Sequence, residues 1–255
     1  MPLEQYLPTQ VFIFVLVFVR IAAIVMLLPG IGETFISMRI RLFFAVVLTL
    51  VIAPVVENFL PLEPPTAGAL GLLVISEIVI GLYLGLIARI LLLTLDTTGR
   101  VISFSIGLAS AQVFNPSSSS QATLPGLILT MLGILMIFVT NLHHLMITAM
   151  VDSYQSFEPG RPLPVNDMGE AIALLVAQSF KIAVQLSAPF LIFSLLFFVA
   201  LGVVARLMPQ MQIFFVGLPV QIAVGVFMLS AILMVMMEVF LGYFGESAAL
   251  FMLPR

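Results

Sequence analysis

The sequence predicts an all-α integral membrane protein that crosses the bilayer about six times. Apolar types make up 62% of its 255 residues and charged types only 8%, whereas a soluble domain carries about 25% charge. The apolar residues lie in runs of about 18 or more, which is the length that crosses a bilayer as a helix. These runs lack the alternation of barrel strands, so we expect helices rather than a closed barrel.

Six apolar runs are expected to be the membrane spans. The first is too long for the apolar core of a signal peptide, and it ends in Pro29-Gly30 without a small-residue cleavage site. We therefore expect it to be retained as a span. The expected spans are residues 11–28, 40–56, 67–95, 124–151, 171–205 and 213–240.

The basic residues predict how these spans are oriented. On one side of a six-span topology, the loops and span ends carry Arg39, Arg41, Arg89, Arg100 and Arg206. The loops on the other side carry one basic residue, Arg161, among the acidic residues Glu57, Glu63, Asp152, Glu158, Asp167 and Glu170. Because basic loops stay in the cytoplasm, both termini are predicted to lie outside it.

Two of the runs are longer than one crossing requires. As single helices, residues 170–206 would extend about 55 Å and residues 67–95 about 43 Å, against a hydrocarbon core of about 30 Å. Pro189 lies in the middle of the longer run and predicts a kink or a break there. Extreme tilt can absorb part of the excess. We favour the alternative, in which the extra apolar length is buried against other protein chains outside the bilayer.

The segment of residues 96–123 does not fit a simple span. It begins DTTGR, continues VISFSIGLASAQVF and ends NPSSSSQAT. Its middle part fits the periodicity of a strand and of a helix, and Asn115-Pro116 marks a break. Non-helical backbone at membrane depth needs a protein cover or a cavity. Two alternatives therefore stay open: a re-entrant, pore-inserted loop or a cytoplasmic amphipathic segment.

Few residues are candidates for chemistry. His143 and His144 are adjacent, so on a helix they point about 100° apart and cannot form an i, i+4 metal pair; the chain also has no cysteine. Glu77, Arg89 and Lys181 lie within or near apolar runs, where charges are costly. We expect each to find a partner on a neighbouring helix or subunit; a proton or ion relay is the alternative. No nucleotide-binding or hydrolase motif is present, and a net charge of −3 gives no footprint for nucleic acid. The sequence predicts neither an enzyme nor a cofactor or metal.

One stretch resembles a known family. Residues 205–222, ARLMPQMQIFFVGLPVQI, closely resemble the signature of the FliR family, the R-type subunit of the export gate in flagellar and virulence type III secretion. The resemblance extends over residues 10–238, and its most specific part is the block from Arg206 to Pro219. Weaker support comes from Gly99-Arg100, Gly107, Phe114-Asn115-Pro116, Asn141–His144 and the region of Pro189.

The resemblance implies a single-copy subunit of a hetero-oligomer in the bacterial inner membrane, at the flagellar basal body, with both termini in the periplasm. Its partners would be P-type and Q-type subunits, the B-type switch protein, membrane lipid and the unfolded flagellar or virulence proteins that pass. Residues 1–169 would form a P-type-like helical part that includes a pore loop near residues 96–123. Residues 170–255 would form a Q-type-like helical hairpin with its tip at residues 206–212.

The resemblance also implies roles for particular residues. A loop that projects into the pore as a plug would comprise Ser110, Ala111, Gln112, Val113, Phe114 and Asn115. At the cytoplasmic hairpin tip, Arg206, Pro209 and Gln210 would contact partners. Apart from the resemblance, the charges Glu77, Arg89 and Lys181 are expected to act in assembly, because charges in apolar runs need partners. Conduction would be passive, through a pore sealed by an apolar constriction that resists wetting.

Two other functions stay open at this point. One is a self-contained secondary transporter or channel for a small solute, with Glu77, Arg89, Lys181 and the histidines along its pathway. Transporters commonly show paired internal repeats, and no convincing repeat is present in this sequence. The other is a scaffold that nucleates a membrane complex without contacting the substrate.

Overall fold

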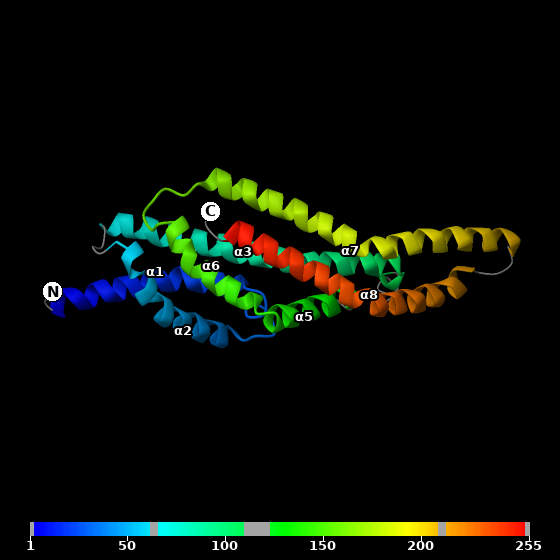
Figure 1. The fold of residues 1–255 in the computed structure, drawn as a ribbon, viewed down its shortest axis with the longest axis horizontal. Coiled ribbons are helices and arrows are strands. Elements are labelled where there is room, and N and C mark those ends of the chain that lie inside the picture. Colours follow the sequence, from blue (N-terminus) through cyan, green and yellow to red (C-terminus); the bar gives the residue numbers. More distant parts are fainter. Residues whose placement is uncertain (1–2, 62–65, 110–122, 209–212, 253–255) are drawn as a thin grey trace. The chain divides into compact units, whose positions relative to one another are not determined.

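The structure is a computed structural model that describes residues 3–61, 66–109, 123–208 and 213–252 (Figure 1). Within these residues the regular structure is helical throughout, in agreement with the predicted fold class. The elements are α1 (Leu3–Leu27), α2 (Met38–Val56), the 3₁₀-helix η1 (Glu57–Phe59), α3 (Ala67–Ser105), α5 (Leu124–Val139), α6 (Leu142–Ser156), α7 (Val165–Leu207) and α8 (Ile213–Met252).

The membrane spans agree with the six apolar runs. Among the described residues, five helices are long and apolar enough to cross a bilayer, and α5 with α6 makes up to six if that pair is one span. The pair is bent by 74°, so the predicted span of residues 124–151 is two helices rather than one. Asn141 lies at the break with a φ of 60°, a left-handed conformation that Asn adopts more readily than most residues.

Helix α3 continues through the first polar part of the segment whose periodicity was ambiguous. Residues 96–105 are helical, which decides between helix and strand for this stretch. The hydroxyls of Thr97 and Thr98 donate to carbonyls one turn earlier at 2.9 and 2.8 Å, and Arg100 pairs with Asp96 at 2.8 Å. These local bonds satisfy the polar side chains inside the helix, so a polar stretch can remain helical.

Three helices are much longer than a bilayer crossing. Helix α7 has 43 residues, α8 has 40 and α3 has 39, so α7 extends about 65 Å against a hydrocarbon core of about 30 Å. Helix α7 runs through Pro189 without a break, and Figure 1 shows it bending in its middle. The structure thus favours a kink over the broken helix that Pro189 also allowed.

The chain folds into two compact units that do not follow the order of the sequence. The first comprises Met1–Leu91, Ile137–Val176 and Phe244–Arg255, and the second comprises Leu92–Met136 and Ala177–Tyr243. Helices α3, α5, α7 and α8 each contribute to both units. The resemblance instead implies a division along the sequence at residue 169, into a P-type-like part and a Q-type-like hairpin. The two compact units do not test that division, which stays a prediction.

Glycines bring the helices of each unit into close contact. In the first unit, side chains at Gly81 and Gly85 of α3 would collide with α1 at Arg20, Ala23 and Leu27. In the second unit, any side chain at Gly99 of α3 would collide with the backbone of α5 at Gly126. Small residues spaced four apart let helix backbones approach closely in membrane proteins, so these glycines fix where the helices cross.

Candidate functional site

A buried ion pair lies at the centre of the first unit. Arg20 of α1 and Glu77 of α3 are both completely buried, and two N–H groups of Arg20 donate to the two carboxylate oxygens of Glu77 at 2.6 and 2.9 Å. This bidentate geometry is the strongest arrangement for such a pair. Glu77 lies one turn before Gly81, on the α3 face that contacts α1, so the local helix geometry directs its carboxylate towards Arg20.

The same guanidinium also contacts α6. It donates to the hydroxyl of Ser153 at 3.2 Å and to the carbonyl of Phe157 at 3.0 Å. Its carbon Cζ lies 3.9 Å from the ring centroid of Tyr154, the geometry of a cation–π contact. Phe157 follows the last residue of α6, where helix carbonyls lack partners within the helix. Arg20 therefore joins α1, α3 and the end of α6.

The other two charges singled out in the sequence are not members of this pair. Arg89 pairs with Glu33, and their side chains are 30% and 11% exposed. Lys181 lies exposed on α7. The structure thus brings Glu77 and Arg89 to separate partners, and the assembly role expected for all three charges stays a prediction.

In the second unit, α8 holds the end of α3. Gln221 is 3% exposed, and its side-chain amide Nε2 donates to the carbonyl of Ser105 at 2.7 Å. Ile106 is fully buried and lies where a side chain at Gly225 would be. Leaving a buried carbonyl without its partner costs about 1–3 kcal/mol, so Gln221 contributes measurably to keeping this end of α3 in place.

The start of α5 also contacts α3 in this unit. The backbone N–H of Gly126 donates to the hydroxyl of Thr123 at 3.2 Å, which satisfies one of the free N–H groups at the beginning of α5. Gly126 in turn lies against Gly99 of α3. Both flanks of residues 110–122 are therefore held by α3, α5 and α8.

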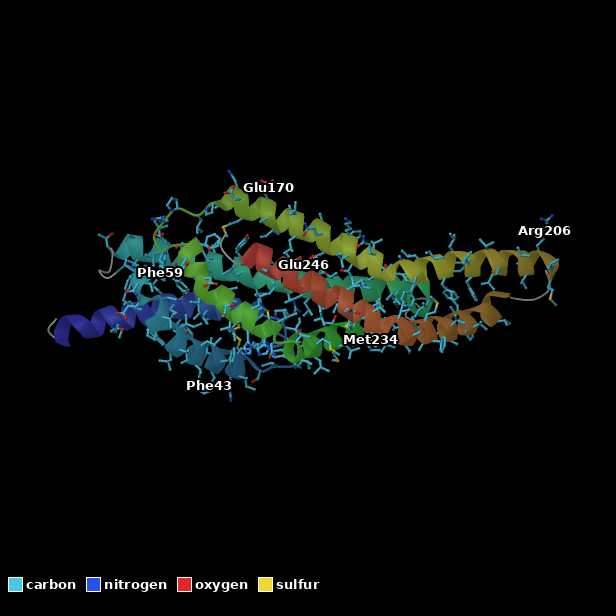
Figure 2. All side chains as sticks on the ribbon, in the orientation of Figure 1. Phe43, Phe59, Glu170, Arg206, Met234 and Glu246 are labelled. Atoms are coloured by element: carbon cyan, nitrogen blue, oxygen red, sulfur yellow. The ribbon has the colours of Figure 1, made fainter. Side chains whose placement is uncertain are left out.

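The predicted plug and most of the predicted hairpin tip lie outside the described residues. This applies to Ser110–Asn115, and to Pro209 and Gln210. Arg206 is described: it lies in the last turn of α7 and is exposed. Figure 2 shows its side chain pointing away from α8. A charged group in this position is free to contact another chain.

The hairpin of α7 and α8 carries apolar grooves within the second unit. The helices contact each other through a hydrogen bond of 2.7 Å between the hydroxyls of Ser179 and Tyr243, and through Leu201, which packs on Gly217. Beside Pro189 they leave an apolar groove of about 350 Å³.

The sequence analysis missed Arg20 and Gln221 as residues of the site. Arg20 lies in an apolar run, and its partner is 57 positions away on another helix, so the sequence alone does not pair the two. Gln221 lies in the signature stretch but looked like an ordinary polar residue there. The available signal for both was the same: an Arg or Gln inside an apolar run must find a partner, since its burial is otherwise costly.

Fold and site together define a polytopic helical membrane protein with a buried interhelical ion pair and long, apolar helices. Residues 11–247 match the model of a family described as bacterial export proteins, family 1. The chain is 44% identical to the flagellar biosynthetic protein FliR of Caulobacter vibrioides over 221 residues, which cover 87% of this chain and 88% of the relative.

Two further relatives extend the comparison. The chain is 33% identical to FliR of Bacillus subtilis over 238 residues, 89% of this chain and 90% of the relative. It is 28% identical to the Yop proteins translocation protein T of Yersinia pestis over 193 residues, 75% of this chain and 74% of the relative. The chain therefore belongs to the FliR family of bacterial export proteins, and the resemblance seen in the sequence is confirmed.

Proposed function

We propose that this chain is the R-type subunit of a type III secretion export gate, where it helps to form and plug the pore through which unfolded proteins cross the bacterial inner membrane. Family membership supports a place in the export apparatus. The observation that carries the proposal beyond the family is that the second half of α7, the longest helix, is left almost uncovered by its own chain.

The second half of α7 is apolar on nearly every side. In an 18-residue stretch of α7 that is apolar enough to span a bilayer, only 6% of the residues are buried within the chain's own structure. The exposed large apolar residues in its second half include Ile192, Leu195, Leu196, Phe198, Val199 and Val203. A helix that is hydrophobic all round needs an apolar environment all round, and α7 is about twice as long as the hydrocarbon core. We propose that apolar helices of other subunits cover the part of α7 that lies outside the lipid.

In this proposal those subunits are the P-type and Q-type chains of the gate, and the B-type switch protein contacts the assembly. Residues 1–169 act as the P-type-like part and residues 170–255 as the Q-type-like hairpin. Arg206, with Pro209 and Gln210, lies at the cytoplasmic tip, and both termini are periplasmic. The arginines at the ends of alternate spans support this orientation.

Residues 110–115 are proposed to be the plug of the pore. Val113 and Phe114 are its large apolar side chains, and an apolar constriction closes a pore by excluding water. The two flanks of this segment support the proposal, because α8 caps the end of α3 and α5 packs on α3.

Replacing Phe114 with Ala is expected to increase the leak of small ions through the assembled gate several-fold while export persists, because the apolar seal becomes smaller and wets more easily. Deletion of residues 112–115 is expected to increase the leak further. The measurement is ion conductance of membranes that contain the assembled complex, normalised to the amount of complex.

The matched control is Phe104→Ala, which removes the same side chain from an exposed position of α3, 72% exposed, outside the proposed plug. Its leak is expected to equal that of the unaltered gate. An unchanged leak in an assembled Phe114→Ala variant would contradict the plug.

The solute-transporter alternative is not favoured. It requires Glu77, Arg89 and Lys181 to line one pathway. Both carboxylate oxygens of Glu77 instead accept hydrogen bonds from Arg20. Arg89 pairs with Glu33, and Lys181 lies exposed on α7. The named relatives are export and translocation proteins.

A further inference from the structure

We infer that a groove between α1 and α2 is a binding site for an ethanolamine phospholipid, with Glu57 as the acceptor for the headgroup ammonium. The groove lies within the first compact unit. It concerns the lipid around the protein, so the inference goes beyond the proposed export function and does not depend on it.

The groove is apolar along its walls and polar at one end. Its volume is about 450 Å³, within the range of about 300–1,000 Å³ that is typical of small-molecule sites. Gln10 is the first lining residue on α1 and Glu57 the last one after α2, and a hydrogen bond joins their side chains, so both polar groups lie at the same end. The apolar walls are formed by Val11, Ile13, Phe14, Leu50, Ala53 and Pro54.

The polar end offers acceptors for a cation. Gln10 Nε2 donates to Glu57 Oε1 at 2.9 Å, which orients the carboxylate and leaves Glu57 Oε2 and Gln10 Oε1 as acceptors. Glu57 is half-buried, and within the described parts of the chain no lysine or arginine forms an ion pair with it. Because a nearby cation stabilises a partly buried carboxylate, the groove is complementary to a ligand that carries a positively charged donor.

The length of α2 indicates that the ligand is a lipid. Helix α2 has 19 residues and therefore extends about 28 Å, which matches a hydrocarbon core of about 30 Å. In contrast with α7, lipid can cover α2 from end to end. Glu57 is the first residue after α2, so its carboxylate lies at the level where the hydrocarbon ends and the headgroups begin. The exposed apolar residues of α2 include Phe43, Val47, Leu50, Val51 and Val55.

An ethanolamine phospholipid fits both the walls and the polar end. One acyl chain lies along the apolar wall, and the primary ammonium has three N–H donors, as a lysine side chain does. These donors form charge-assisted hydrogen bonds with Glu57 and Gln10. A choline headgroup has the same charge but no N–H donor. A glycerol headgroup brings only the negative phosphate, which Glu57 repels. The carboxylate therefore selects ethanolamine.

The test is a competition among three phospholipids that share their acyl chains and differ in headgroup: ethanolamine, choline and glycerol. The delipidated full chain in mild detergent is mixed with equal amounts of the three, and native mass spectrometry counts the adducts. We expect ethanolamine adducts to exceed choline adducts about tenfold, the ratio that one charge-assisted hydrogen bond provides.

Two variants assign this selectivity to the polar end of the groove. Glu57→Gln keeps the shape of the side chain and removes its charge, so the ratio is expected to fall close to one. Gln10→Met removes the second acceptor and the bond that orients Glu57, and is expected to lower the ratio several-fold. The matched control is Asp167→Asn, which removes an exposed carboxylate from the first turn of α7, outside the groove; its ratio is expected to equal that of the unaltered chain. Because the ratio is measured within each sample, a lower yield of a variant does not change it.

The inference would be overturned by a ratio close to one in the unaltered chain, by a preference for the glycerol headgroup, or by an unchanged ratio in Glu57→Gln. An equal loss of selectivity in Asp167→Asn would also overturn it, because negative charge in general would then explain the preference. A carbodiimide cross-link between Glu57 and a lysine of another subunit in the assembled complex would show that a protein side chain occupies the groove instead. None of these outcomes depends on whether the chain forms a pore.

Discussion

Arg20→Ala is expected to destabilise the protein by about 3–5 kcal/mol, the cost of leaving one member of a buried ion pair without its partner. Glu77 would remain fully buried with no cation to compensate it, and α1 would lose its polar contacts to Ser153 and Phe157. The measurement is the free energy of unfolding of the purified chain in mild detergent, together with the yield of folded protein in the membrane.

Arg161→Ala is the matched control, because it removes an arginine from its pair with Glu158, in which the side chains are 73% and 41% exposed, and is expected to cost about 1 kcal/mol or less. Replacing both members of the buried pair, Arg20→Met with Glu77→Leu, is expected to recover most of the lost stability, since a buried pair and apolar groups of similar volume are nearly equivalent. A cost for Arg20→Ala no larger than that for Arg161→Ala would contradict the role assigned to the buried pair.

Gly99→Ala is expected to destabilise the second unit by about 1–3 kcal/mol through overpacking. The added methyl group would collide with the backbone of Gly126, which cannot rotate away as a side chain can, so α3 and α5 must separate. The loss is measured as a lower unfolding midpoint in detergent and a lower yield of the assembled gate.

Gly242→Ala provides the comparison, because a side chain at Gly242 of α8 meets no atom within 4 Å. This change is expected to leave stability unchanged or raise it by about 0.5–1 kcal/mol, the general advantage of Ala over Gly inside a helix. Equal behaviour of the two variants would show that the contact between Gly99 and Gly126 does not limit packing.

The spans could be predicted from the sequence because hydropathy determines them almost alone. All six apolar runs coincide with helices of the structure. Their ends were less predictable: α3 continues past residue 95 because Thr97, Thr98 and Arg100 satisfy their side chains within the helix. The break at Asn141 is also local in origin: hydropathy falls at Thr140-Asn141 and at His143-His144, but a local fall in hydropathy does not show that the helix bends there.

The site was harder to predict because its contacts join distant parts of the chain. The sequence indicated that Glu77 needs a partner, but spacing along one helix cannot identify Arg20 on another. Gln221 and Ser105 are separated by 116 positions, and the donor is a side chain while the acceptor is backbone, which no residue pattern records. The plug and the tip came only from the resemblance, and residues 110–115 and 209–210 lie outside the described residues.

Native mass spectrometry of the tagged chain, co-expressed with its operon neighbours and extracted in mild detergent, tests the central claim most directly. The account predicts one copy of this 27.7 kDa chain within a much heavier assembly of small helical membrane proteins, because α7 needs other chains to cover it. A stable, monodisperse monomer or homodimer under the same conditions would contradict the account.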